Sequence, residues 1–212
     1  MQAVPLPRSQ VIGFFVASAL LLGITAQHHS SVTLALTAAT LAMFAACYWS
    51  ACVLLGSRPA QVFVVVGVAL GWFAEQMGSS RGWFFGRYTY TEVLGLRLGD
   101  VPIVVPLMWF GLPFACMVLA NLILWRRPVD AAPNWGRVGL TAFFAAMLIT
   151  AFDLGADPYF VYVLKAWIME KPDGGWFGET LQGFVGWMVV CFAVVLVFRM
   201  AAPAQQALPP AS

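Results

Sequence analysis

The sequence predicts an all-α, polytopic membrane protein, a transmembrane bundle of about six spans with two irregular Gly- and aromatic-rich loops on one face. Only 9% of the 212 residues are charged, 61% are hydrophobic, and the mean hydropathy is +0.84. Soluble proteins carry about a quarter charged residues, so this composition excludes an ordinary soluble domain. Apolar runs of roughly 20 residues, long enough to cross a bilayer, recur along the chain. The net charge of +2 and the lack of a basic run argue against a nucleic-acid partner.

The expected spans are defined by these apolar runs. They lie near residues 10–27, 32–56, 60–79, 101–125, 138–164 and 182–201. The first follows a short head containing Arg8 and resembles a signal sequence, but five more spans follow, so we interpret it as a retained helix. Short turns join the first three spans. An even number of spans places both termini on one side and both longer loops on the other. We expect residues 1–202 to form one domain and residues 203–212 a disordered tail.

Three carboxylates occupy positions that a membrane protein tolerates poorly. Glu75, Asp153 and Asp157 each lie inside or at the end of an apolar run. A charge in the hydrocarbon layer costs at least about 2.5 kcal/mol, so such residues usually face a cavity or a partner. Asp153 and Asp157 are four residues apart, which places them one turn apart on one helix face. Pro158 removes a helical hydrogen bond and predicts a kink or break one turn before it, beside both aspartates.

Two loops rich in Gly and aromatic residues leave the same expected membrane face. The first contains the pattern Gly-x-x-Phe-Gly-x-Tyr-x-Tyr, which ends at Tyr90, and continues to the run Val-Pro-Ile-Val-Val-Pro-Leu-Met-Trp, which ends at Trp109. The second follows Asp157 and leads through Trp167 to Trp187. Irregular backbone at membrane depth is tolerated where it lines an enclosed cavity. We therefore expect the carboxylates of the third and fifth spans to converge on one pocket beneath the loops.

These elements, in this order over roughly residues 72–190, resemble the integral-membrane carotenoid biosynthesis family that includes carotenoid 1,2-hydratases and bisanhydrobacterioruberin hydratase. The resemblance implies hydration of the terminal double bond of an acyclic carotenoid end group, without a cofactor. It implies a lycopene-like polyene and water as substrates, the lipid bilayer as surroundings, and other carotenoid biosynthesis enzymes as partners. We expect a multi-pass protein of the cell (inner) membrane.

The hydration chemistry assigns a role to each class of candidate residue. A carboxylic acid protonates carbon 2, a tertiary cation forms at carbon 1, and water captures it while a second carboxylate takes the proton. Burial favours the neutral form of a carboxyl group, and two close aspartates share a proton as a pair. Asp153, Asp157 and Glu75 are the catalytic candidates. Aromatic faces stabilise a nearby cation and suit a flat polyene. The substrate-binding candidates are Trp83, Phe84, Tyr88, Tyr90, Trp109, Trp167, Trp176 and Trp187.

Other interpretations stay open at the level of sequence. The aspartates can cap a broken helix or pair with a nearby basic residue. Glu75 can be a partner for Arg81, and Tyr88 and Tyr90 can belong to an interfacial aromatic belt. End-group cyclisation shares the protonated alkene with hydration. A proton-coupled transporter would use the same carboxylates as a relay, and a non-catalytic subunit that organises pigment enzymes would need them only for packing.

Overall fold

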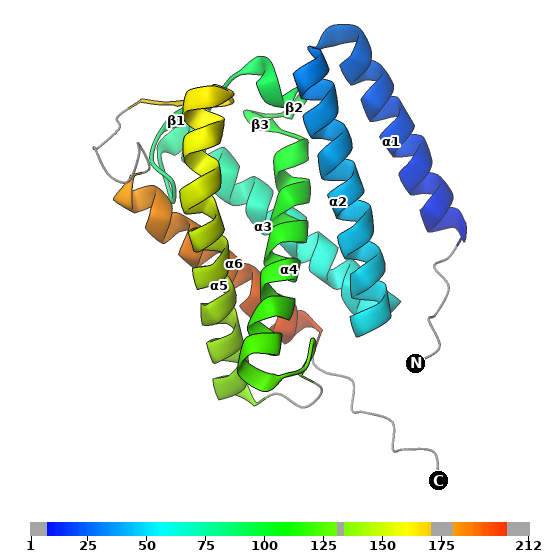
Figure 1. The fold of residues 1–212 in the computed structure, drawn as a ribbon, viewed down its shortest axis with the longest axis vertical. Coiled ribbons are helices and arrows are strands. Elements are labelled where there is room, and N and C mark those ends of the chain that lie inside the picture. The colour runs from blue at the N-terminus through cyan, green and yellow to red at the C-terminus, as the bar shows by residue number, and fades with distance from the viewer. Residues whose placement is uncertain (1–7, 131–133, 171–179, 203–212) are drawn as a thin grey trace.

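Six long helices form an elongated bundle in the computed structural model, which describes residues 8–130, 134–170 and 180–202 (Figure 1). They are α1 (Arg8–His28), α2 (Ser31–Leu55), α3 (Ser57–Arg81), α4 (Val104–Trp125), α5 (Trp135–Pro158) and α6 (Leu181–Ala201). All six are long and apolar enough to cross a membrane. The predicted all-α polytopic class and its six spans are confirmed. The fourth helix begins later than expected because Val101–Pro102 forms a strand. The predicted tail, residues 203–212, lies outside the described residues.

Side-chain caps set the start of three helices. The hydroxyl of Ser30 accepts a hydrogen bond from the Thr33 amide, and Asn134 and Thr180 cap α5 and α6 in the same way. Each cap satisfies one of the amides that a helix leaves without a partner at its first turn. Between α2 and α3, Gly56 adopts a φ of 90°, which only glycine tolerates readily. The first three helices therefore follow one another through the short turns that the sequence predicts.

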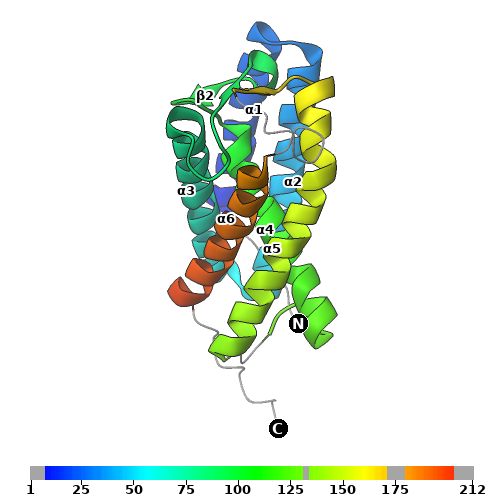
Figure 2. The same cartoon turned by 90° about the vertical axis from the view of Figure 1, so that its left-hand side faces the viewer.

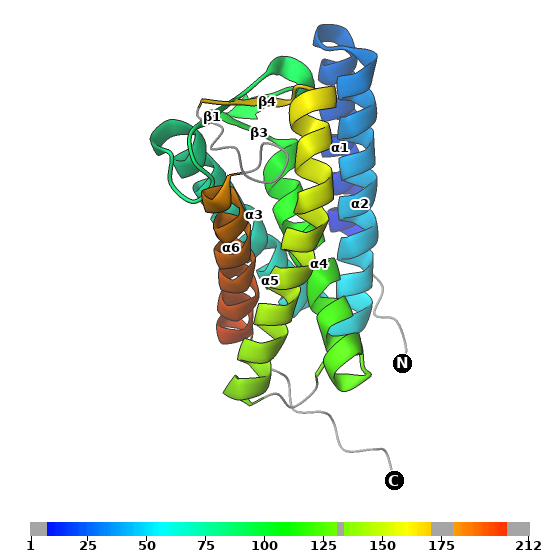
Figure 3. The ribbon, with the colours of Figure 1, turned by 60° about the vertical axis from the view of Figure 1, so that its left-hand side comes forward.

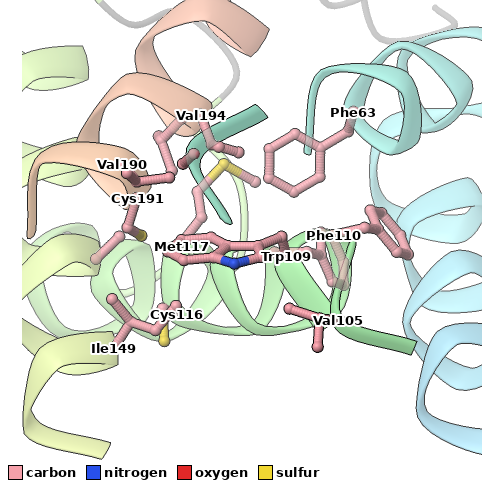
Figure 4. Close-up of a cluster of buried hydrophobic side chains, with 14 of the residues drawn as sticks. Phe63, Val105, Trp109, Phe110, Cys116, Met117, Ile149, Val190, Cys191 and Val194 are labelled. Atoms are coloured by element: carbon pink, nitrogen blue, oxygen red, sulfur yellow. The ribbon is translucent and has the colours of Figure 1, made fainter. Parts of the chain in front are cut away.

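Helix α4 lies at the centre of the bundle, where it contacts α2, α3, α5 and α6, while α1 packs against α2 at the edge. Figure 4 shows the core around α4, in which Trp109 and Met117 lie near Phe63 of α3 and Val194 of α6. A side chain at Gly71 of α3 would overlap the indole of Trp109. Because Gly71 has no side chain, α3 and α4 approach closely and the Trp109 indole packs against the backbone of α3.

Four short strands gather at one end of the bundle (Figure 3). Strand β1 (Tyr88–Tyr90) pairs antiparallel with β4 (Trp167–Met169), with Tyr90 opposite Trp167. Strands β2 (Arg97–Leu98) and β3 (Val101–Pro102) form a second pair. The β1–β4 pair joins the two predicted loops directly, which confirms that both leave the same face of the bundle. The strands themselves were not predicted.

The β2–β3 hairpin and the short 3-10 helix η1 (Glu92–Leu94) complete this end of the molecule. The hairpin lies over the end of α3 (Figure 2). Gln76 fixes it there: its Nε2 donates to Asp100 Oδ2 at 2.6 Å, and its Oε1 accepts from the Asp100 amide at 2.9 Å. Trp72 Nε1 also donates to the Leu98 carbonyl at 3.0 Å. These hydrogen bonds hold the first loop against the end of α3.

Pro158 does not break the helix one turn before it. The α-helix continues through Asp153 and Asp157 to Pro158, so the expected break one turn earlier does not occur. The φ of Pro158 is −56°, which fits a helix although the residue donates no hydrogen bond. The irregularity comes afterwards, in a π-helical turn η2 (Tyr159–Val163), where the Leu164 amide donates to the Tyr159 carbonyl. Both aspartates are therefore held on regular helix.

Candidate active site

The three carboxylates lie in the wall of a single cavity beneath the β1–β4 pair. The cavity has a volume of about 80 Å³. Its lining comes from α3, α4, α5, α6 and the loop segments between them. The lining residues are Glu75, Phe85, Tyr88, Tyr90, Leu94, Val105, Met108, Trp109, Leu112, Phe152, Asp153, Ala156, Asp157, Phe160, Trp167 and Trp187. Apart from the carboxylates the wall is almost entirely apolar or aromatic, so the charged groups face an environment poor in water.

Glu75 is buried and receives hydrogen bonds from three aromatic side chains. Trp109 Nε1 donates to Oε1 at 2.8 Å, and Tyr90 donates to Oε2 at 2.7 Å. The Tyr88 hydroxyl also donates to Oε2. Within the described residues Glu75 is therefore bonded to these donors rather than to Arg81, and the ion-pair interpretation is wrong. The three donors satisfy both oxygens of the Glu75 carboxyl group.

The strand geometry explains why both tyrosines reach the same carboxylate. Side chains alternate along a strand, so Tyr88 and Tyr90 point to one side and Thr89 to the other. Both tyrosines are buried and Thr89 is exposed, which rules out an interfacial belt. Arg97 donates to the Tyr90 carbonyl at 2.9 Å. The Thr91 hydroxyl donates to the Lys165 carbonyl at 2.7 Å, so the second loop holds the first in register.

Asp153 and Asp157 are buried on the inner face of α5, one turn apart as the spacing predicts. Both line the cavity. Glu75 and Tyr90 line the same cavity. The second and third acidic groups of the cavity are therefore carried by a helix rather than by a loop.

Aromatic rings form most of the remaining wall. Trp109 and Trp187 stack with centroids 4.5 Å apart, and Phe160 stacks on Trp167 at 5.3 Å. Phe85 contacts both Trp109 and Trp187. Phe85 and Phe160 were not among the residues predicted to bind substrate. Phe85 is nevertheless the phenylalanine of the Gly-x-x-Phe motif, and Phe160 follows Asp157 by three residues, nearly one helical turn.

Two other aromatic candidates, Trp83 and Phe84, do not lie in this wall. Trp83 is half exposed, and neither it nor Phe84 lines the cavity. Phe84 instead has a positive φ of 59° and its ring lies against Phe73 of α3. Its backbone fills the space beside Gly186 of α6, where a side chain would overlap the Phe84 carbonyl. Trp176 lies outside the described residues.

The two phenols of the site are predicted to make stability sensitive to alkaline pH. Burial, followed by the adjacent Glu75 charge, raises the pKa of Tyr88 and of Tyr90 well above the usual value of 10.0. In the unfolded chain these phenols ionise near pH 10, while in the folded protein they keep their protons. Their contribution to stability is therefore complete below pH 10 and is lost as the pH rises above it.

We expect the thermal midpoint of the detergent-solubilised protein to fall above pH 10, and to fall less in the double variant Tyr88→Phe, Tyr90→Phe. Thermal unfolding followed by circular dichroism across this range measures the difference. Tyr162→Phe removes a phenol that is 58% exposed and serves as the matched control. A double variant with the same alkaline slope as the wild-type protein would contradict the prediction.

Together, the fold and the cavity define a multi-pass membrane protein with acidic groups enclosed in an aromatic pocket. Residues 30–211 match the carotenoid biosynthesis protein family, and the chain belongs to this family. It is also similar to the bisanhydrobacterioruberin hydratase of Haloarcula japonica, with 30% identity over 145 residues. That match covers 68% of this chain and 46% of the relative, so the chain spans about half the length of the relative. No solved structure matches.

Proposed function

We propose that this protein adds water to the terminal carbon–carbon double bond of an acyclic, lycopene-like carotenoid. One observation carries the proposal: three buried carboxylates face one small cavity walled by aromatic rings, inside helices long enough to span a membrane. Family membership supports a carotenoid as the substrate, and the similarity to a hydratase supports hydration. The bilayer that dissolves the polyene would be the cell (inner) membrane.

In the proposed reaction the Asp153–Asp157 pair supplies the acid. One of the two carboxyl groups transfers its proton to carbon 2, where the electron pair of the double bond forms the new C–H bond. Carbon 1 becomes a tertiary cation. A water oxygen bonds to carbon 1, and one water proton passes to a carboxylate, which gives a tertiary alcohol. The sum is addition of one water with no oxidant, reductant or cofactor, and a final proton transfer restores the acid.

Glu75 is assigned the role of the permanent anion. Its three donors, Tyr88, Tyr90 and Trp109, hold it in one orientation, and its charge stabilises the cation at carbon 1 across a medium of low dielectric constant. The stacked indoles of Trp109 and Trp187 add their π faces to the same effect. A cavity of about 80 Å³ has room for an end group or for several water molecules, since one water needs roughly 10–15 Å³.

The test is a pigment assay in a lycopene-producing host that expresses this protein. The expected product is heavier than lycopene by one water, as measured by liquid chromatography and mass spectrometry. In deuterium oxide the product should also retain one deuterium on carbon after exchange back into water, because the acid delivers a solvent-derived proton. An unchanged profile across several acyclic carotenoids would reject the proposal. A ring-containing product of unchanged mass would assign cyclisation instead.

A further inference from the structure

The proposed hydration leaves open how a polyene reaches the buried carboxylates. We infer that the carotenoid enters sideways from the bilayer, between α4 and α5, and that only its end group occupies the cavity. The inference rests on the proposed function for the identity of the polyene. Its structural basis is separate: the size of the cavity, the closure of the loop side, and the exposure of a few lining residues.

The cavity is too small for a whole carotenoid. Its volume of about 80 Å³ is below the roughly 150 Å³ of an engineered protein cavity that binds benzene. A terminal group of a few carbons fits such a space, whereas a long conjugated chain does not. Most of the substrate must therefore remain outside the cavity during the reaction.

The side that faces the loops is closed by buried residues. Tyr88 and Tyr90 of β1, Leu94 of η1 and Ala166 before β4 are each at most 5% exposed. Hydrogen bonds between Thr91 and the second loop hold this cover in place. Of the cavity-lining residues on this side, Phe160 and Trp167 are partly exposed, but neither is exposed to the degree of Phe152.

The cavity wall is more exposed where α4 and α5 pack side by side (Figure 1). Phe152 lines the cavity and is nevertheless 50% exposed, and Met108 and Leu112 are partly exposed lining residues. We call these three residues the rim. They are all apolar, and Phe152 is the most exposed of the lining residues. The lining residues Ala156, Phe160, Trp167 and Trp187 are also partly exposed.

The rim lies at membrane depth. Leu112 follows the start of α4 at Val104 by eight residues, or about 12 Å along the axis. Phe152 precedes the end of α5 at Pro158 by six residues, or about 9 Å. Both distances place the rim within a hydrocarbon layer about 30 Å thick. Its surroundings are therefore acyl chains, the phase in which a carotenoid dissolves.

Photocrosslinking in membranes tests the position of the bound polyene. We expect the variant Phe152→p-benzoylphenylalanine, irradiated in lycopene-containing membranes, to give a protein–lycopene adduct. Phe143 is the matched control, because it lies on the same helix and is 45% exposed but does not line the cavity. The same substitution there should lose the adduct. Equal adducts at both positions, or adducts at position 152 only to phospholipid acyl chains, would overturn lateral access.

A blocking substitution provides the second measurement. Leu112→Trp should lose most of its conversion of lycopene, because the larger side chain fills the rim. Leu119→Trp is the control, since Leu119 lies on the same helix, 50% exposed and away from the cavity. Equal conversion by both variants would count against the rim. If Leu112→Trp fails to accumulate in the membrane, the crosslinking result decides.

The two proposals fail in different ways. Crosslinking needs no reaction at the double bond, so the adduct at position 152 is expected even in an inactive Glu75→Gln background. If the protein gives no hydrated product but forms a selective adduct at position 152, the proposed function is rejected and lateral access is retained. Hydration with equal adducts at positions 152 and 143 would reject lateral access and retain the function.

Discussion

Glu75→Gln is expected to reduce carotenoid conversion by at least about 100-fold, the scale of a lost acid–base or electrostatic group. The amide keeps the size of the carboxyl group and can still bond to Trp109 and the two phenols, whose oxygens also accept. Only the charge is removed. The expected result follows from the position of Glu75, whose charge has three aromatic donors and faces the cavity where the cation would form. Product yield per unit of membrane-inserted protein measures the effect.

Glu170→Gln is the matched control for the same chemical change. Its side chain is about half exposed and lies 3.9 Å from Arg87 at the surface, where an ion pair contributes little. It should convert carotenoid as the wild-type protein does. A Glu75→Gln protein that is folded, inserted and fully active would remove Glu75 from the mechanism.

Asp153→Asn and Asp157→Asn are each expected to abolish conversion, again by a factor of at least about 100. The two carboxyl groups are buried one turn apart and line the same cavity, and in the proposed mechanism they supply the acid together. An amide cannot donate a proton of the required acidity at either position. Liquid chromatography of the pigments measures the loss, and the deuterium content of residual product reports whether proton delivery has failed.

The folding of these two variants needs a check of its own, because a buried carboxyl group also contributes hydrogen bonds. Accumulation in the membrane and the thermal midpoint in detergent should stay close to those of the wild-type protein. If both variants keep full activity, the acid lies elsewhere. If both variants fail to fold, Asp153→Glu and Asp157→Glu provide a second test, because each keeps a carboxyl group and moves it by one methylene. Complete loss of activity in these folded variants would show that the position of the carboxyl group matters, and not only its charge.

The sequence predicts much of the fold and the acidic members of the site. Apolar runs locate the six spans because each must cross the same thickness of hydrocarbon. The high cost of a charge in that layer singles out Glu75, Asp153 and Asp157, and the four-residue spacing correctly places the two aspartates on one face.

The hydrogen-bond partners of Glu75 could not be predicted from the sequence. Arg81 is near it along the chain and so was considered as its partner, whereas the true partners depend on strand pairing. Tyr90 faces Glu75 because β1 pairs with β4 in one register, and a shift of one residue would turn it away. That register is set by residues far along the chain and leaves no local pattern. The break expected beside Pro158 does not occur, because the φ of Pro158 fits an α-helix.

The pairing of β1 with β4 also has a consequence for biogenesis. Thr91 and its partner Lys165 are 74 positions apart, so at about 5–20 residues per second the ribosome completes the second strand roughly 4–15 s after the first. During that interval α4 and α5 are synthesised, while β1, which carries Tyr88 and Tyr90, has no strand partner. The nascent chain can therefore pair β1 with β4 only after α5, which carries Asp153 and Asp157, has been synthesised.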